Sequence, residues 1–140
     1  MSIFVTEPRQ LIEAIAEKLK EYPEVKAPEG SEFWKTAHYK ELAPVEDDFW
    51  FIRAASLMRK IAKYGPIGVN KLRKQYGGRN RRKMGLGHSS KASGKIIRVA
   101  LQQLEDANLL NGTEKDGRKL SPEGQSLLER TAYAIMRISK

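Results

Sequence analysis

The sequence contains no cysteine and no long apolar run. Without cysteine in its 140 residues, disulfides, thiolate metal sites and cysteine nucleophiles are excluded, and a reducing compartment such as the cytosol is expected. No segment approaches the roughly 18 apolar residues that cross a bilayer, and residues 1–10 lack the basic and then apolar order of a signal peptide. We therefore expect a soluble cytoplasmic protein with no membrane partner, folded as one domain over residues 1–140.

Acidic residues are missing from the middle of the chain, between Asp48 and Glu105. The 56 residues between them hold 14 of the 26 Lys and Arg residues and none of the 17 Asp and Glu residues. The formal net charge is +9 and the pI is about 9.8. This separation of charge predicts a polyanionic partner. The alternative is a merely solvated surface, although a surface made only for solubility would mix charges of both signs.

Sequence signals for catalysis, metals and cofactors are also missing. Gly94 and Lys95 are followed by Ile96 instead of Ser or Thr, so the chain lacks a nucleotide-binding P-loop. His38 and His88 are the only histidines and do not have metal-ligand spacing. No paired carboxylates accompany the basic region. We expect neither an enzyme nor a bound cofactor or metal.

The N-terminal part predicts an amphipathic helix followed by a short one. Thr6 can cap the first helix, with Pro8 in its first turn. Pro23, Pro28 and Gly30 interrupt the chain afterwards, and residues 31–39 predict a short helix capped by its serine. The apolar face of the first helix is expected to consist of Leu11, Ile12, Ile15 and Leu19.

A second helix is expected from an Asp48 cap to Tyr64, with Gly65 at its end. Phe49 and Ile52 interrupt its cationic side, either as contacts for a partner or, for Phe49, as a cover for the helix start. Arg53, beside the packed face, could instead cap a neighbouring helix. Helical spacing predicts an inner face of Trp50, Ala54, Leu57, Met58 and Ile61 and a cationic side with Arg53, Arg59, Lys60 and Lys63.

The segment YGGRNRRKMGLGHSSKASGK, residues 76–95, predicts a basic loop. It follows residues 67–76, read as a short strand and a short helix with Val69 and Leu72 inward. Its glycines and charges cannot bury enough apolar area to offset the entropy of ordering, so we expect it to order on a partner. His88 is interpreted as an RNA contact or a loop anchor. The basic residues of the segment are Arg79, Arg81, Arg82, Lys83, Lys91 and Lys95.

A third major helix is expected from about Ser93, followed by a hairpin and a last helix. If this third helix extends back to Lys91, then Lys91, Lys95, Arg98 and Gln102 form one stripe, typical of a recognition helix; the alternative is a basic solvent face. Asn108 is the expected end of the helix, residues 109–120 predict a hairpin, and Ser121 with Pro122 starts the last helix. The inward residues of the third helix are Ile96, Ile97, Ala100, Leu101 and Leu104.

This order of elements predicts a mainly α, winged helix-turn-helix-like domain with a β-hairpin wing. It has an extra N-terminal helix, and a long basic loop is inserted before the recognition helix. A standard helix-turn-helix joins its last two helices by three or four residues. Here about 16 residues intervene between Tyr76 and Ser93.

Four stretches in this order and spacing, RAASLMRK, GPIGVNKLRKQYGGR, SGKIIRVALQQLE and GRKLSPEGQ, resemble the small-subunit ribosomal protein nineteen-e family of archaea and eukaryotes. The resemblance covers nearly the whole chain. It implies a structural, non-catalytic protein that binds ribosomal RNA in the head of the small subunit, beside neighbouring ribosomal proteins, and assists late maturation. The resemblance carries over the family's important basic positions as Arg53, Arg59 and Arg98, and its Y-G-G-R turn as residues 76–79.

Together, these observations predict a ribosomal RNA-binding protein that is monomeric when free. The predicted contacts are Arg53, Arg59, Lys60, Lys63, Arg79, Arg81, Arg82, Lys83, His88, Lys91, Lys95 and Arg98. The main alternative is a winged-helix transcription regulator that reads DNA, for which Gln102 and Gln103 are the amide base readers on the recognition helix. A second alternative is a protein-interaction module that uses the last helix.

Overall fold

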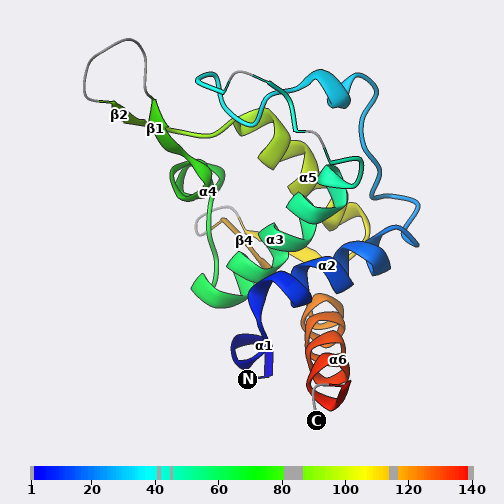
Figure 1. Cartoon of the computed structure of the whole chain (residues 1–140). Helices are drawn as coiled ribbons and strands as arrows, with labels where there is room; N and C mark the ends of the chain where they lie inside the picture. The colour runs from blue at the N-terminus through cyan, green and yellow to red at the C-terminus, as the bar shows by residue number, and fades with distance from the viewer. Residues whose placement is uncertain (1, 41, 45, 81–86, 114–116, 139–140) are drawn as a thin grey trace.

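The computed structural model describes residues 2–40, 42–44, 46–80, 87–113 and 117–138. Both termini lie at one end of the molecule, and a two-stranded ribbon projects from the opposite end (Figure 1). No helix in these ranges is long and apolar enough to cross a membrane. In chain order the elements are α1 (Ser2–Val5), α2 (Pro8–Leu19), the 3-10 turn η1 (Ser31–Phe33), α3 (Phe49–Tyr64), α4 (Val69–Tyr76), β1 (Gly78–Asn80), β2 (His88–Ser90), α5 (Gly94–Asp106), β3 (Leu110–Thr113), β4 (Gly117–Leu120) and α6 (Pro122–Ile138).

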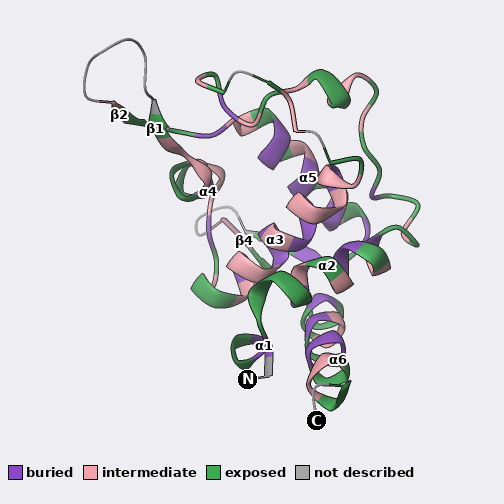
Figure 2. Ribbon diagram, in the orientation of Figure 1, coloured by how far each residue is buried: buried purple, intermediate pink, exposed green. Residues whose placement is uncertain are grey.

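Helix α3 lies within the core because one of its sides is apolar along its whole length. Helices α2 and α5 pack against α3, and α6 packs against α1 and α2. The buried residues follow the inward-facing sides of these helices (Figure 2). Each buried aliphatic side chain contributes on the order of 1.5–3 kcal/mol through removal from water. The predicted inner face of α3 is confirmed, since Trp50, Ala54, Leu57, Met58 and Ile61 are all buried.

Helix α5 and the hairpin after it form the part of the fold that matches a winged helix-turn-helix. The five inward residues predicted for α5 are all buried, and Asn108 takes a left-handed conformation, with φ of 65°, where α5 ends. Strands β3 and β4 pair antiparallel, from Leu110 opposite Leu120 to Thr113 opposite Gly117. An isolated bridge joins Ile67 to Arg118 in β4. The fold is therefore mainly helical with a small antiparallel sheet, and its order is compatible with a winged helix.

The predicted N-caps at Ser121, Thr6 and Asp48 have different outcomes in the structure. The Ser121 hydroxyl accepts a hydrogen bond from the Gly124 amide at 3.1 Å, which confirms the cap of α6. The Thr6 cap is wrong: the residue at the N-cap position of α2 is Glu7, and Thr6 is buried. Asp48 is at the N-cap of α3 as predicted, but its side chain makes no capping bond. Its carboxylate instead accepts a hydrogen bond from the Lys20 ammonium at 2.9 Å, which joins α3 to the end of α2.

The segment between α2 and α3 is less helical than predicted. The expected helix over residues 31–39 is wrong, because only the 3-10 turn Ser31–Phe33 forms and Trp34 is already extended. The Trp34 ring packs edge-on against Trp50, with 6.3 Å between the ring centroids. The short helix α1, which the sequence pattern did not predict, buries Ile3.

The two ends of the predicted basic loop form a β-ribbon. Strand β1 pairs antiparallel with β2, placing Gly78 opposite Ser90 and Asn80 opposite His88. Residues 81–86, which include the predicted contacts Arg81, Arg82 and Lys83, lie outside the described residues. The paired strands replace an irregular loop because their backbone groups satisfy one another across the ribbon.

Candidate nucleic-acid interface

The cationic side of α3 is organised around the ring of Tyr76 from α4. The guanidinium of Arg53 lies 4.3 Å from the centre of this ring, and the ammonium of Lys60 lies 4.5 Å from it. The phenol oxygen of Tyr76 is 2.6 Å from the hydroxyl of Ser56, so a hydrogen bond fixes the ring against α3. Because Arg53, Ser56 and Lys60 recur at helical spacing, a single aromatic side chain contacts all three. We call Arg53, Ser56, Lys60 and Tyr76 the tyrosine cluster.

Burial and like charges both act on the ionisable groups of the tyrosine cluster. Burial lowers the pKa of Arg53, since it disfavours the charged guanidinium. Burial is also the largest cause that lowers the pKa of Lys60, and the nearby cations Arg53, Arg59 and Lys63 lower it further. Burial raises the pKa of Tyr76, which therefore stays neutral. The cluster therefore concentrates positive charge, and a bound anion would stabilise the charged forms of Arg53 and Lys60.

Arg59 adds an unused hydrogen-bond donor beside the tyrosine cluster. Its Nε atom is buried and has no hydrogen-bond partner within the described part of the chain. Nor do Arg53, Arg59, Lys60 or Lys63 pair with a carboxylate among the described residues. A buried donor without a partner costs on the order of 1–3 kcal/mol. This side of α3 therefore has donors and charge in excess of what the protein itself satisfies.

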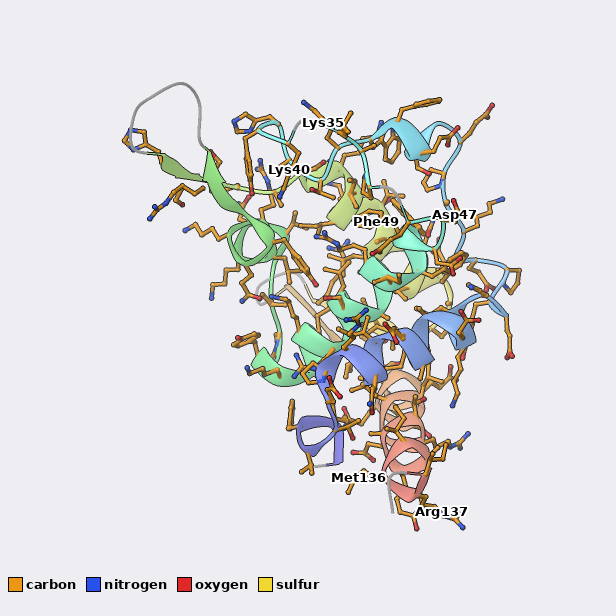
Figure 3. The ribbon with its side chains drawn as sticks, in the orientation of Figure 1. Lys35, Lys40, Asp47, Phe49, Met136 and Arg137 are labelled. Carbon is orange, nitrogen blue, oxygen red and sulfur yellow. The ribbon has the colours of Figure 1, made fainter. Side chains whose placement is uncertain are left out.

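Arg53 and the aromatic start of α3 contact each other in the structure. Arg53 stacks on Tyr76 and also lies 5.1 Å from the ring centre of Phe49, whereas no described hydrogen bond places it at a helix end. Phe49 and Ile52 are half-buried and pack against the core. Figure 3 shows Phe49 at the start of α3, near the segment that carries Asp47. Phe49 thus covers the helix start and supports Arg53 at the same time.

The predicted contacts on and before α5 form two further groups. Arg98 is exposed and lines a groove of about 680 Å³ together with Lys71 and Arg73. Lys91 is exposed and lines a second groove of about 380 Å³ with Arg73, Lys35 and His38. Arg73 therefore borders both grooves, and no carboxylate among the described residues lines either of them.

The predicted stripe along α5 is only partly correct. Helix α5 begins at Gly94, so Lys91 lies before it in extended chain and is not in helical register with Arg98. The ammonium of Lys95 lies 4.5 Å from the ring centre of Trp34, the aromatic residue that packs on Trp50. The side chain of Lys95 therefore contacts the N-terminal segment. Helical periodicity could not predict this contact, since the aromatic ring lies 61 positions earlier in the sequence.

The ribbon carries the remaining predicted RNA contacts that lie among the described residues. Arg79 in β1 and His88 in β2 are both exposed. Their strands extend away from the body of the protein, on the side where α4 lies (Figure 1). The ribbon therefore presents its basic residues beyond the surface formed by α3 and α5.

One of the two amides that could read DNA bases from α5 is used inside the protein. The Gln103 side-chain oxygen accepts a hydrogen bond from the indole N–H of Trp50 at 2.7 Å. Its amide nitrogen donates to the carbonyl of Lys26 at 2.8 Å. Of these two glutamines, only Gln102 is exposed. This arrangement weakens the DNA-reading alternative, since recognition of adenine requires a free amide.

Sequence reasoning missed three residues that organise the surface. Tyr76 was grouped with the glycine turn, whereas its ring supports the cations of α3. Lys71 and Arg73 were left out although they belong to the acid-free stretch and line the grooves next to Arg98 and Lys91. The absence of acidic residues around them was the available signal. Among the described residues, no group of three or more His, Cys, Asp or Glu side chains is placed to hold a metal ion.

The chain is similar to ribosomal proteins over nearly its whole length. The family model of ribosomal protein S19e matches residues 3–138. The small ribosomal subunit protein eS19 of Haloarcula marismortui is 46% identical over 139 residues, which cover 96% of this chain and 91% of that protein. The protein of the same name from Aeropyrum pernix is 47% identical over 128 residues, covering 90% and 84%. That from the bivalve Mya arenaria is 41% identical over 122 residues, covering 87% and 82%.

The matched family is one of ribosomal proteins, and such proteins are generally not enzymes. The family model matches a range that includes α3, β1, β2, α5 and the β3–β4 hairpin. The chain belongs to the ribosomal protein S19e family.

Proposed function

We propose that this protein is a structural, non-catalytic component of the small ribosomal subunit that binds ribosomal RNA as one domain over residues 1–140. A protein of this family works in the ribosome and therefore in the cytoplasm. We further propose that it lies in the subunit head beside neighbouring ribosomal proteins, assists late maturation, and is a monomer when free. The observation that carries the proposal is the tyrosine cluster with Arg59, in which cations are supported by an aromatic ring and no described carboxylate neutralises them.

The mechanism that we propose is phosphate binding by surfaces on three elements. The tyrosine cluster holds Arg53 and Lys60 in place, so fewer side-chain rotamers must be fixed when a phosphate binds. Arg98 and Lys91 supply cations from the two grooves that meet at Arg73. The ribbon, with the predicted contacts Arg81, Arg82 and Lys83 beyond its described strands, would extend between RNA segments. Selectivity would come from the shape of the RNA, because the deep major groove of A-form RNA is too narrow for side chains to read.

Salt-dependent binding tests this proposal. Lys63 and Arg98 are exposed, so the double variant Lys63→Gln, Arg98→Gln removes two charges with little effect on the core. The control is Arg130→Gln, Arg137→Gln on α6, where Arg137 lies at the end of the molecule opposite Lys35 and Lys40 (Figure 3). Each lost phosphate contact should flatten the slope of log K against log salt by about one unit. We expect a loss of about two units for the first variant and of less than one for the control.

The RNA should be a fragment from the head of the small subunit, and the competitor a mixed-sequence DNA duplex. Selective binding of the RNA at moderate salt supports the proposal. Equal affinity for both polymers, or equal slopes for the two double variants, would contradict it. Urea unfolding of each variant is the control for folding.

A further inference from the structure

The segment that leads from the ribbon into α5 is bonded to α4 through Arg73. Strand β1 follows α4 after Gly77, and β2 leads through Lys91, Ala92 and Ser93 into α5. The carbonyl of Arg73 in α4 accepts a hydrogen bond from the Ala92 amide at 2.9 Å. The Nε of Arg73 donates to the carbonyl of Ala92, also at 2.9 Å. Arg73 thus binds both backbone polar groups of one buried residue, Ala92, in the segment between β2 and α5.

The residues around these two hydrogen bonds are closely packed. A Cβ atom on Gly77 would lie 2.1 Å from the carbonyl oxygen of Ser90, so the two strands approach closely from the first residue. A Cβ atom on Gly94 would lie 3.2 Å from Cδ of Arg73, so the side chain also fills the space at the start of α5. The Ser93 amide donates to the carbonyl of Thr36 at 2.6 Å, which fixes the next residue to the N-terminal segment.

We propose that Arg73 is a positioning residue that sets the direction of the ribbon relative to α4 and α5, and so the place where its basic residues meet RNA. A two-stranded ribbon alone is only marginally stable and needs such anchorage. Each strand rises about 3.3 Å per residue, so the far end of the ribbon lies at a distance from Ala92. A small rotation at Ala92 therefore displaces that end by several times the range of donor–acceptor distances that a hydrogen bond allows. A ribbon with a fixed direction also loses less conformational entropy on binding.

Arginine suits this position better than lysine. Its Nε–H lies in the plane of the guanidinium and donates to the carbonyl of Ala92, and the same residue lines both grooves. A lysine would keep the charge but has no donor at the Nε position. Arg73→Lys therefore separates the positioning role from the charge.

The orientation of the ribbon can be measured in the free protein. Since the chain has no cysteine, nitroxide labels can be placed through the exposed substitutions Ser89→Cys in β2 and Ala134→Cys in α6, and pulsed dipolar spectroscopy gives the distribution of distances. A second labelled pair, Gln102→Cys with Ala134→Cys, reports on α5 itself. The control is Lys74→Met, which removes an exposed cation next to Arg73 in the chain.

We expect Arg73→Met and Arg73→Lys to broaden the Ser89 to Ala134 distribution at least twofold, while the Gln102 to Ala134 distribution and the Lys74→Met variant stay unchanged. An unchanged Ser89 to Ala134 distribution in Arg73→Met would overturn the proposal. Broadening of both distributions would also overturn it, since Arg73 would then stabilise the whole fold instead of the ribbon.

The part of the inference that concerns RNA rests on the proposed function and has its own test. Arg73→Lys should bind the head-domain RNA fragment about 3- to 10-fold more weakly with an unchanged salt slope, because charge is kept and direction is lost. Wild-type affinity in Arg73→Lys would overturn this part. If the wild-type protein does not prefer the RNA, the proposed function fails, whereas the distance distributions still decide whether Arg73 positions the ribbon.

Discussion

Replacing Tyr76 should damage both folding and RNA binding, and two substitutions separate the contributions of its ring and its hydroxyl. Tyr76→Phe removes only the hydrogen bond to Ser56, whose oxygens are 2.6 Å apart. Tyr76→Leu also removes the ring under Arg53 and Lys60. Leucine keeps a branched apolar side chain of helical propensity, so helix α4 itself should persist.

The magnitudes follow from the contacts. One hydrogen bond contributes about 1 kcal/mol, so Tyr76→Phe should lower the free energy of unfolding by that amount. Two cation–ring contacts contribute about 0.5–1 kcal/mol each in partly exposed positions. Tyr76→Leu should therefore lower the free energy of unfolding by about 2–3 kcal/mol in total.

The assays are urea unfolding and salt-dependent binding of the head-domain RNA fragment. Tyr76→Phe should bind RNA nearly as wild type, because both cations keep their support. Tyr76→Leu should bind more weakly and with a salt slope close to that of wild type, because the charges remain but are no longer held in place. Equal losses of stability in the two variants would refute the role of the ring. Wild-type affinity in Tyr76→Leu would refute its link to binding.

Three further predictions concern the same region. The pKa of Tyr76 is raised in the folded protein, so above about pH 10 the unfolded chain loses this proton first. The free energy of unfolding should therefore fall as pH rises. This fall should be shallower in Tyr76→Phe, as measured by urea unfolding between pH 9 and 11. Gly77→Ala should abolish amide protection in the ribbon, because its Cβ would meet the backbone oxygen of Ser90 at 2.1 Å. Gly78→Ala should be milder and should be rescued by Tyr39→Phe, because its Cβ would meet only the Tyr39 hydroxyl, at 2.5 Å; absence of rescue in hydrogen exchange would contradict this account.

Helical periodicity predicted the elements whose partners lie within the same pattern. The inner faces of α3 and α5, the end of α5 at Asn108 and the cap of α6 at Ser121 agree with the structure, because each depends on spacing or on a bond between nearby residues. The cap at Thr6 was wrong by one position, as expected where several residues can begin a helix.

The sequence by itself determined the helical framework and the concentration of positive charge, because helical spacing and charge are properties of the chain. Tertiary structure alone decided how that charge is used. Tyr76 supports Arg53 and Lys60, Trp34 draws in Lys95, and Arg73 holds Ala92. These partners come from different elements, so their contacts form only when the helices pack, and no local pattern records them.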